Sequence, residues 1–336
     1  MSLDLVRVAV IGVGYLGRFH AEKLRRMKNV DLVAVVDSDP ARARELASDL
    51  GVRAYADHRE IIDLVDAATV VTPTVSHYAV ASDLLAAGRD VLCEKPITAT
   101  IEEADALVEL AASKGRILQV GHLERFNPAV EDLVGRVRHP LFIEANRIAP
   151  FKARATDVDV ALDLMIHDLD IILAAVGQEP REIRAVGVPV LGPHADIVNA
   201  RLEFPTGCVA NVTASRLALK DERKMRIFQP DAYFSLDFRK RKLLVVSGVE
   251  YRPGKLPKVE AERPRFAKSD PLESELKDFV EAVRTRRAPR VGGQDGRRAL
   301  ACALAVRACV QKGLCGMESL LEAPRRWVDA RLPGDE

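Results

Sequence analysis

Short apolar runs alternate with amphipathic stretches through the first third of the chain. Each run is nearly unbroken, which is typical of strands buried on both faces of a parallel sheet. The predicted strands span residues 6–11, 32–36, 67–72, 90–93 and 116–120. Amphipathic helices are predicted between them at 40–50, 76–87 and 100–113. Strands and helices alternating at these intervals predict an α/β fold with a doubly wound parallel sheet.

The pattern changes near residue 127. A helix at 128–137, a strand at 141–148 and a long helix at 159–176 come first. Stretches of strand character follow without helices between them, at 183–190, 197–204, 208–217, 224–228, 233–238 and 243–246. Such a run predicts an α+β domain with a mainly antiparallel, open sheet. Residues 248–268, rich in proline and charge, are predicted to be an exposed loop, and the last two helices begin at Asp270 and Asp295.

Three glycines follow the first predicted strand at dinucleotide-binding spacing, with Tyr15 and Leu16 before the last of them. Gly12 would permit a tight turn, Gly14 the close approach of a pyrophosphate, and Gly17 close packing of helix on strand. The helix N-terminus would then point at the phosphates. Because glycine triplets also occur in ordinary turns, the prediction of a Rossmann dinucleotide site depends on the strand that follows.

That second strand ends at Asp37, whose carboxylate could accept both hydroxyls of the adenosine ribose. An acid there would repel a 2′-phosphate, so NAD is favoured over NADP. Arg42 and Arg44 lie close behind and keep NADP open. With 336 residues, the chain has room for a second core. We predict a dinucleotide-binding domain at 1–125 and a substrate and oligomerisation domain at 126–336.

Polar residues gather where the other parallel strands end, and ligands bind at those ends. They are Thr72, Thr74, Glu94, Lys95 and His122, with Pro73 between the two threonines. The ammonium of Lys95 could stabilise the alkoxide that forms as a hydride leaves a substrate, although a surface lysine is usually just solvated. His20, His77 and His122 are weaker candidates near the cofactor, with a structural role as the plainer interpretation.

One face of the predicted helix 159–176 carries Asp159, Asp163, His167 and Asp170, whereas nearly everything else on it is apolar. Asp163 and His167 are one turn apart, so a carboxylate could orient the imidazole and raise its basicity, as a general base requires. An ordinary amphipathic face with satisfied carboxylates is the alternative.

The amino-acid composition indicates which classes of binding partner to expect. Lys and Arg (50) nearly balance Asp and Glu (49), so no net field would draw the chain to nucleic acid or an anionic membrane. The five cysteines form no CxxC pair, which favours reduced thiols, and the His and acidic residues show no metal spacing. Without a signal segment or a membrane-spanning apolar run, a cytoplasmic protein is expected.

Taken together, these motifs resemble the glucose-fructose oxidoreductase, inositol dehydrogenase and MocA (Gfo/Idh/MocA) family. The marks are the segment from Gly12 to His20, Thr72-Pro73-Thr74 with His77, Glu94-Lys95-Pro96, Asp163 with His167, and Gly293-Gln294-Asp295-Gly296. The resemblance implies a nicotinamide-dependent dehydrogenase of sugar or inositol hydroxyls, commonly a dimer or tetramer joined through the open sheet. It also implies that Lys95, Asp163 and His167 are the catalytic trio.

The sequence at 121–128 and 163–168 resembles that of a subgroup that includes UDP-N-acetylglucosamine 3-dehydrogenases, whose ketone product is aminated for a diamino lipid A. The chain lacks the glycines that many family members carry around Asp163, which argues against a simple transfer of the inositol pocket. Arg125, Arg147 and Lys152, with Arg154, would then face the substrate and its diphosphate. Equally, Arg147, Lys152 and Arg154 could be plain surface cations. A free sugar, an inositol or a dihydrodiol is the rival substrate, and a non-catalytic NAD-binding sensor is the rival of another class.

Overall fold

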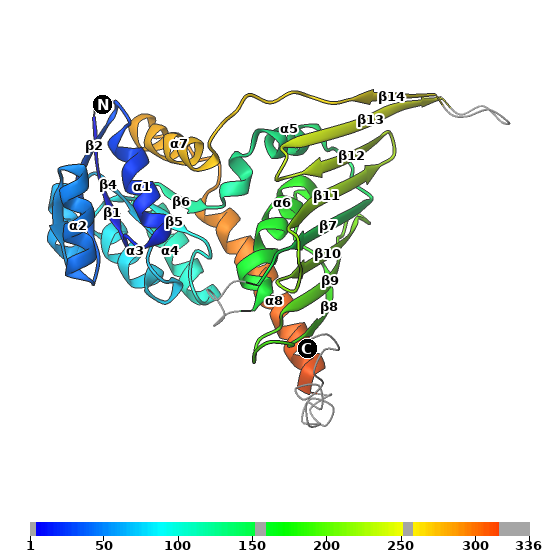
Figure 1. Cartoon of the computed structure of the whole chain (residues 1–336), viewed down its shortest axis with the longest axis horizontal. Coiled ribbons are helices and arrows are strands. Elements are labelled where there is room, and N and C mark those ends of the chain that lie inside the picture. The colour runs from blue at the N-terminus through cyan, green and yellow to red at the C-terminus, as the bar shows by residue number, and fades with distance from the viewer. Residues whose placement is uncertain (1–4, 152–158, 251–257, 316–336) are drawn as a thin grey trace, which may run out of the picture.

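A six-stranded parallel sheet forms the first body of the computed structural model, which describes residues 5–151, 159–250 and 258–315 (Figure 1). Its strands are β1 (Val6–Ile11), β2 (Val30–Val36), β3 (Arg53–Tyr55), β4 (Ala67–Val70), β5 (Asp90–Glu94) and β6 (Leu118–Gly121). Their order is β3-β2-β1-β4-β5-β6, and all neighbours run parallel. The doubly wound sheet is confirmed.

Helices cover both faces of this sheet. They are α1 (Tyr15–Arg25), α2 (Pro40–Leu50), α3 (His77–Ala86), α4 (Ile101–Ser113) and the 3-10 turns η1 (His58–Leu64) and η2 (Thr74–Ser76). Local chemistry sets their ends. Gly51, in the left-handed region at φ 65°, closes α2, and Thr100 and Glu103 form a capping box at the start of α4.

The second body is an eight-stranded sheet. Its strands are β7 (Phe142–Ile148), β8 (Glu182–Val188), β9 (Ile197–Glu203), β10 (Val209–Ser215), β11 (Glu222–Gln229), β12 (Ala232–Asp237), β13 (Lys242–Glu250) and β14 (Lys258–Glu262). The order is β14-β13-β12-β11-β7-β10-β9-β8. Only β7 and β10 pair in parallel among these strands. The mainly antiparallel sheet is therefore confirmed.

The exposed loop predicted at 248–268 is wrong in part. β13 runs on to Glu250 and β14 pairs with it along the sheet edge, whereas residues 263–268 are irregular as predicted and residues 251–257 lie outside the described residues. Every residue of β14 is exposed. Val259 and Ala261 alternate with charged residues in β14, but this strand signal is short and lies in a stretch rich in proline and charge, so it was not recognised.

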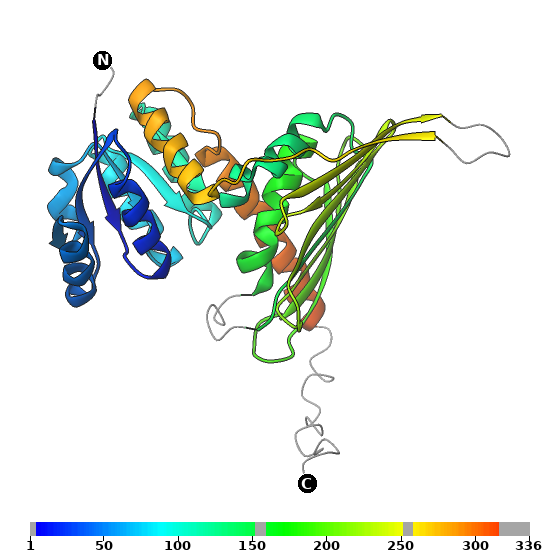
Figure 2. The same cartoon turned by 45° about the horizontal axis from the view of Figure 1, so that its top comes forward.

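Helices cover the face of the second sheet that is turned toward the first body, and its other face is open (Figure 2). These helices are α5 (Pro128–Arg136), α6 (Ile166–Val176) and α8 (Gly293–Cys315). A 3-10 turn, η3 (Leu123–Phe126), joins the first body to α5, and a π-helical turn, η4 (Ala161–Met165), precedes α6. The long helix predicted at 159–176 is therefore a π turn followed by an α-helix.

The last two helices connect the bodies. Leu276 and Phe279 of α7 (Pro271–Thr285) share one buried core with Val8 and Val10 of β1. Helix α7, far beyond residue 125 in the sequence, thus packs as part of the first body. The domain boundary at residues 125 and 126 stays a prediction. Leu300 of α8 lies in the core of the first body, whereas the following turns of that helix lie in the core of the second. No helix in the described ranges is long and apolar enough to cross a bilayer.

Candidate active site

The turn after β1 leaves a cradle in the backbone. Gly12 has φ +87°, and a Cβ there would lie 2.6 Å from the carbonyl oxygen of Val71. A Cβ on Gly17 would lie 1.8 Å from the oxygen of Gly12, so α1 packs directly on the turn. A Cβ on Gly14, by contrast, would meet nothing within 4 Å. The open space at the N-terminus of α1 fits the approach of a dinucleotide pyrophosphate.

Tyr15 and Leu16, the first residues of α1, are exposed beside this cradle, and the ring of Tyr15 packs edge-on against Phe19 with centroids 5.2 Å apart. Asp37 stands at the end of β2 with 7% exposure. Its carboxylate accepts hydrogen bonds from the N–H groups of Val13 and Asp39, both at 2.9 Å, and lies 3.3 Å from a guanidinium nitrogen of Arg42. These bonds fix the carboxylate against the glycine turn, where a ribose would lie.

Two buried histidines hold the neighbouring loops. The ring nitrogens of His77 each lie 2.8 Å from a carbonyl oxygen, one of Thr72 and one of Pro96. Pro73 and Thr74 lead from that loop into η2. His20, fully buried, places Nε2 3.1 Å from Oε1 of Glu94. Both placements match the structural role considered for these histidines.

Lys95 bridges the two bodies. Its Nζ donates to the backbone oxygen of Asp163 at 2.8 Å and lies 3.4 Å from the carboxylate Oδ1 of the same residue. Both side chains are partly exposed, 19% for Lys95 and 35% for Asp163. Below them, the Glu94 carboxylate accepts from the Lys95 backbone N–H at 3.3 Å. The geometry thus brings Asp163 of η4 against Lys95, at the end of β5.

His167 lies in the first turn of α6. Its Nδ1 is buried and has no hydrogen-bond partner among the described residues. Burial, with the positive charges of Lys95 and Arg147 next in effect, lowers the pKa of His167 well below its ordinary value of 6.5. The imidazole is therefore neutral at neutral pH and able to accept a proton.

The expected hydrogen bond from the His167 imidazole to the Asp163 carboxylate is not formed: Nδ1 of His167 has no partner among the described residues, and the carboxylate is turned to Lys95. The π turn at 161–165 changes the angle between positions 163 and 167 relative to an α-helix. Asp159 accepts from the N–H groups of Ala161 and Leu162 at the start of that turn. For Asp159 the satisfied-carboxylate interpretation holds.

His122, Arg125 and Asp170 form a buried group beside the site. Nδ1 of His122 is 4.0 Å from Asp170, and a guanidinium nitrogen of Arg125 is 3.3 Å from the same carboxylate. Burial lowers the pKa of His122 and raises that of Asp170. The charge of Arg125 is thus already matched within the protein.

Arg147 is not a surface cation, because only 2% of its side chain is exposed. Its Nε and one terminal nitrogen donate to the two oxygens of Asp168 at 2.8 and 2.9 Å, and the other terminal nitrogen donates to Glu124 at 3.0 Å. The guanidinium also stacks over Phe238, 5.2 Å from the ring centroid. Because its guanidinium is bonded to Asp168 and Glu124 and stacked on Phe238, Arg147 has no exposed group that could bind a substrate diphosphate. Lys152 and Arg154 lie outside the described residues.

Sequence reasoning missed three charged residues of this region, Glu124, Asp168 and Arg223. Each lies in a different element, and only the fold brings them to Arg147. No cluster of three or more potential metal ligands occurs in the described ranges. Cys93, Cys208, Cys302 and Cys309 are free thiols, and burial raises the pKa of Cys302 to about 12.

Comparison with known proteins gives this geometry a family. A model described as an oxidoreductase family with an NAD-binding Rossmann fold matches residues 6–122, and the GFO/IDH/MocA C-terminal domain matches residues 135–233. A UDP-N-acetylglucosamine 3-dehydrogenase of Acidithiobacillus ferrooxidans is 42% identical over 91% of this chain and 97% of its own length. The chain belongs to the Gfo/Idh/MocA family.

A solved structure and a second family member support this assignment. A solved structure of the A. ferrooxidans enzyme superposes with a TM-score of 0.87 at 42% identity, covering 92% of this chain and 98% of that one. A myo-inositol 2-dehydrogenase of Thermotoga maritima is 29% identical over 88% of this chain and 93% of its own length. The protein is an NAD(P)-dependent dehydrogenase acting on CH–OH groups.

Proposed function

We propose that this protein oxidises a ring hydroxyl of a nucleotide sugar, the 3-hydroxyl of a UDP-N-acetyl sugar, with NAD as the hydride acceptor. The observation that carries the proposal is the contact of Lys95 with Asp163 across the two bodies, one turn before a neutral His167. The near full-length relative that acts on UDP-N-acetylglucosamine supports the substrate.

NAD is proposed over NADP because Asp37 is fixed at the end of β2, where its negative charge would repel a 2′-phosphate. Arg42 does not reverse this, since its guanidinium already lies against that carboxylate. The turn from Gly12 to Gly17 would hold the pyrophosphate, and the loops at Thr72–Thr74, Glu94 and His122 would face the nicotinamide half. Bound there, NAD would supply the acceptor for the hydride that leaves the substrate carbon.

The residues divide the remaining work. His167 takes the hydroxyl proton, because its low pKa keeps it neutral and it stands on the rigid start of α6. The ammonium of Lys95 hydrogen-bonds the same oxygen and stabilises the negative charge that develops there. Asp163 holds the ammonium in place and hydrogen-bonds the sugar. Arg147 and Arg125 act as positioning residues through Asp168 and Asp170 and do not contact the substrate.

The assembly and setting belong to the same proposal. We propose a homodimer or homotetramer joined through the open face of the second sheet, in the cytoplasm. The ketone product would be aminated for lipid A, as for the subgroup that the sequence resembles.

The first test is the absorbance of reduced nicotinamide with NAD and a panel of UDP-sugars, free sugars and inositols. Turnover of UDP-N-acetylglucosamine alone would support the proposal, whereas turnover of only free sugars or inositols would refute its substrate. Lys95→Ala should abolish turnover and leave NAD affinity largely intact. Unchanged turnover in that variant would refute the mechanism, and a wild-type protein that binds NAD but stays silent with a ketone trap would favour a sensor.

A further inference from the structure

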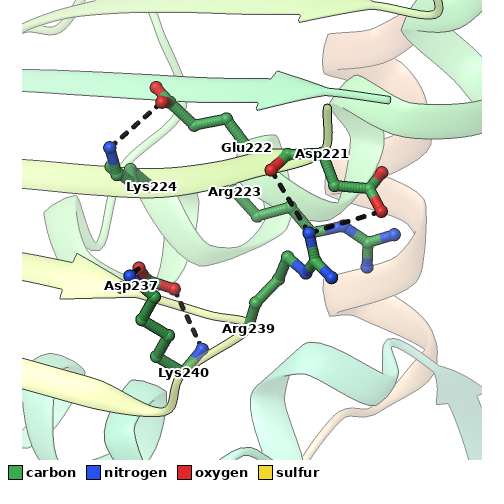
Figure 3. A pocket seen from close by; sticks show the side chains of 7 residues that line it. All are labelled: Asp221, Glu222, Arg223, Lys224, Asp237, Arg239 and Lys240. Atoms are coloured by element: carbon green, nitrogen blue, oxygen red, sulfur yellow. Dashed lines mark hydrogen bonds and ion pairs between the residues drawn. The ribbon is translucent and has the colours of Figure 1, made fainter. Parts of the chain in front are cut away.

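A pocket of about 390 Å³ opens at one end of the second sheet. It lies where β11 begins and β12 ends, and its lining consists of four cations and three carboxylates (Figure 3). These are Arg223, Lys224, Arg239, Lys240, Asp221, Glu222 and Asp237. The lining thus carries one positive charge in excess, which favours an anionic ligand.

The excess charge is that of Arg223. The other three cations each lie by a carboxylate of the lining: Lys224 is 3.0 Å from Glu222, Arg239 is 3.5 Å from Asp221, and Lys240 is 3.9 Å from Asp237. Arg223 has a carboxylate neighbour only at 3.9 Å, Glu124, and its buried Nε has no hydrogen-bond partner among the described residues. A guanidinium with an unsatisfied, buried N–H loses free energy that a bound anion would restore.

A continuous set of contacts connects this pocket to the catalytic residues. Arg223 stands opposite Arg147 in the register of β11 and β7. Arg147 in turn forms two hydrogen bonds to Asp168, the residue next to His167. The charge of Arg223 is also among those that lower the pKa of His167, after burial, Lys95, Arg147 and His122. The pocket is therefore linked to His167 through Arg147 and Asp168.

We propose that Arg223 and Arg239 form the subsite for the diphosphate of a nucleotide-sugar substrate. This inference rests on the proposed function, because a diphosphate is attached to the sugar ring that is oxidised. Arg223 and Arg239 reach the same pocket from β11 and from the end of β12 (Figure 3). Two guanidinium groups that converge in this way suit the paired oxygens of a phosphate. This subsite replaces Arg147, whose guanidinium is already fully bonded to Asp168 and Glu124.

The test measures UDP binding by calorimetry in protein saturated with NADH, with uridine as the ligand that lacks phosphate. The variants are Arg223→Gln and Arg239→Gln. The matched control is Arg226→Gln, on the opposite face of β11, where Arg226 pairs with Glu144 at 2.8 Å. Losing one charge-assisted contact should weaken UDP binding at least about tenfold and raise the KM for UDP-N-acetylglucosamine. NADH affinity and the melting temperature should not change.

A second readout excludes a merely structural role. Removing the charge of Arg223 should raise the pKa of His167, so the acid limb of kcat/KM should move to higher pH in Arg223→Gln. UDP affinity equal to wild type in both variants would overturn the subsite and leave the proposed function standing. A wild-type protein that neither binds UDP nor oxidises UDP-sugars would overturn both. If Arg223→Gln does not fold, Arg239→Gln decides alone, since Arg239 is 55% exposed.

Discussion

The two sides of the active site are built in different ways. The cofactor side consists of turns at the ends of neighbouring strands, where Gly12, Gly14 and Asp37 act through backbone geometry and short hydrogen bonds. The substrate side consists of long charged side chains from η3, β7, α6 and β11, which meet only in the folded chain. Short sequence motifs determine the local geometry of the cofactor side, whereas the network of ion pairs on the substrate side depends on strand order and register.

The largest expected effect concerns the cofactor side. Gly17→Ala would place a Cβ 1.8 Å from the Gly12 oxygen. We therefore expect the free energy of unfolding to fall by more than the about 1–3 kcal/mol that is usual for overpacking, and NAD binding to be lost. Gly14→Ala is the matched variant, because its Cβ meets nothing within 4 Å. It should keep the melting temperature and weaken NAD binding. Equal melting temperatures for the two variants would contradict this account of the turn.

The same difference explains what could be predicted from sequence. The parallel sheet, the glycine turn and the bounds of α2 follow from apolar runs, glycines and caps, all of which act over a few residues. Arg147 shows the opposite case. Its sequence neighbours gave no sign of Asp168 or Glu124, and the alternation of β7 became informative only once α6 was known to cover that face. The π turn η4 likewise lacks a local signal, and the alternation in β14 covers only five residues.

Arg147→Met tests whether the substrate side depends on its buried network. Removing the cation leaves Asp168 and Glu124 without their main partner in a buried site, which costs about 3–5 kcal/mol in comparable cases. Urea denaturation should show this loss, whereas the exposed control Arg226→Met should lie within about 0.5 kcal/mol of wild type. Arg147→Met with Asp168→Leu should recover part of the loss. A stable single variant would mean that the ion pair contributes little.

The pH dependence of oxidation tests the environment of His167. The base must be neutral, and burial places its pKa well below 6.5, so kcat/KM should hold at pH 6.5 and fall only at lower pH. The measurement is a pH profile at limiting substrate with NAD saturating. An acid limb above pH 6.5 would show that His167 is either more solvated than the geometry implies or not the base.

The smallest expected effect concerns Glu275 of α7. This side chain is fully buried beneath the cofactor side, so that side also contains a buried charged residue type. Its carboxyl oxygens have no hydrogen-bond partner among the described residues, and burial, with Glu94 and Asp278 adding to it, raises its pKa well above 4.5. The folded state then keeps a proton that the unfolded chain releases, so this group lowers stability as pH rises above 4.5. Glu275→Gln should therefore melt several degrees higher than wild type at pH 8, at about 2–4 °C per kcal/mol, and the gap should close toward pH 4.5. The exposed Glu273→Gln on the same helix should show no such gap. A constant gap at every pH would assign the effect to packing and not to a proton that Glu275 releases on unfolding.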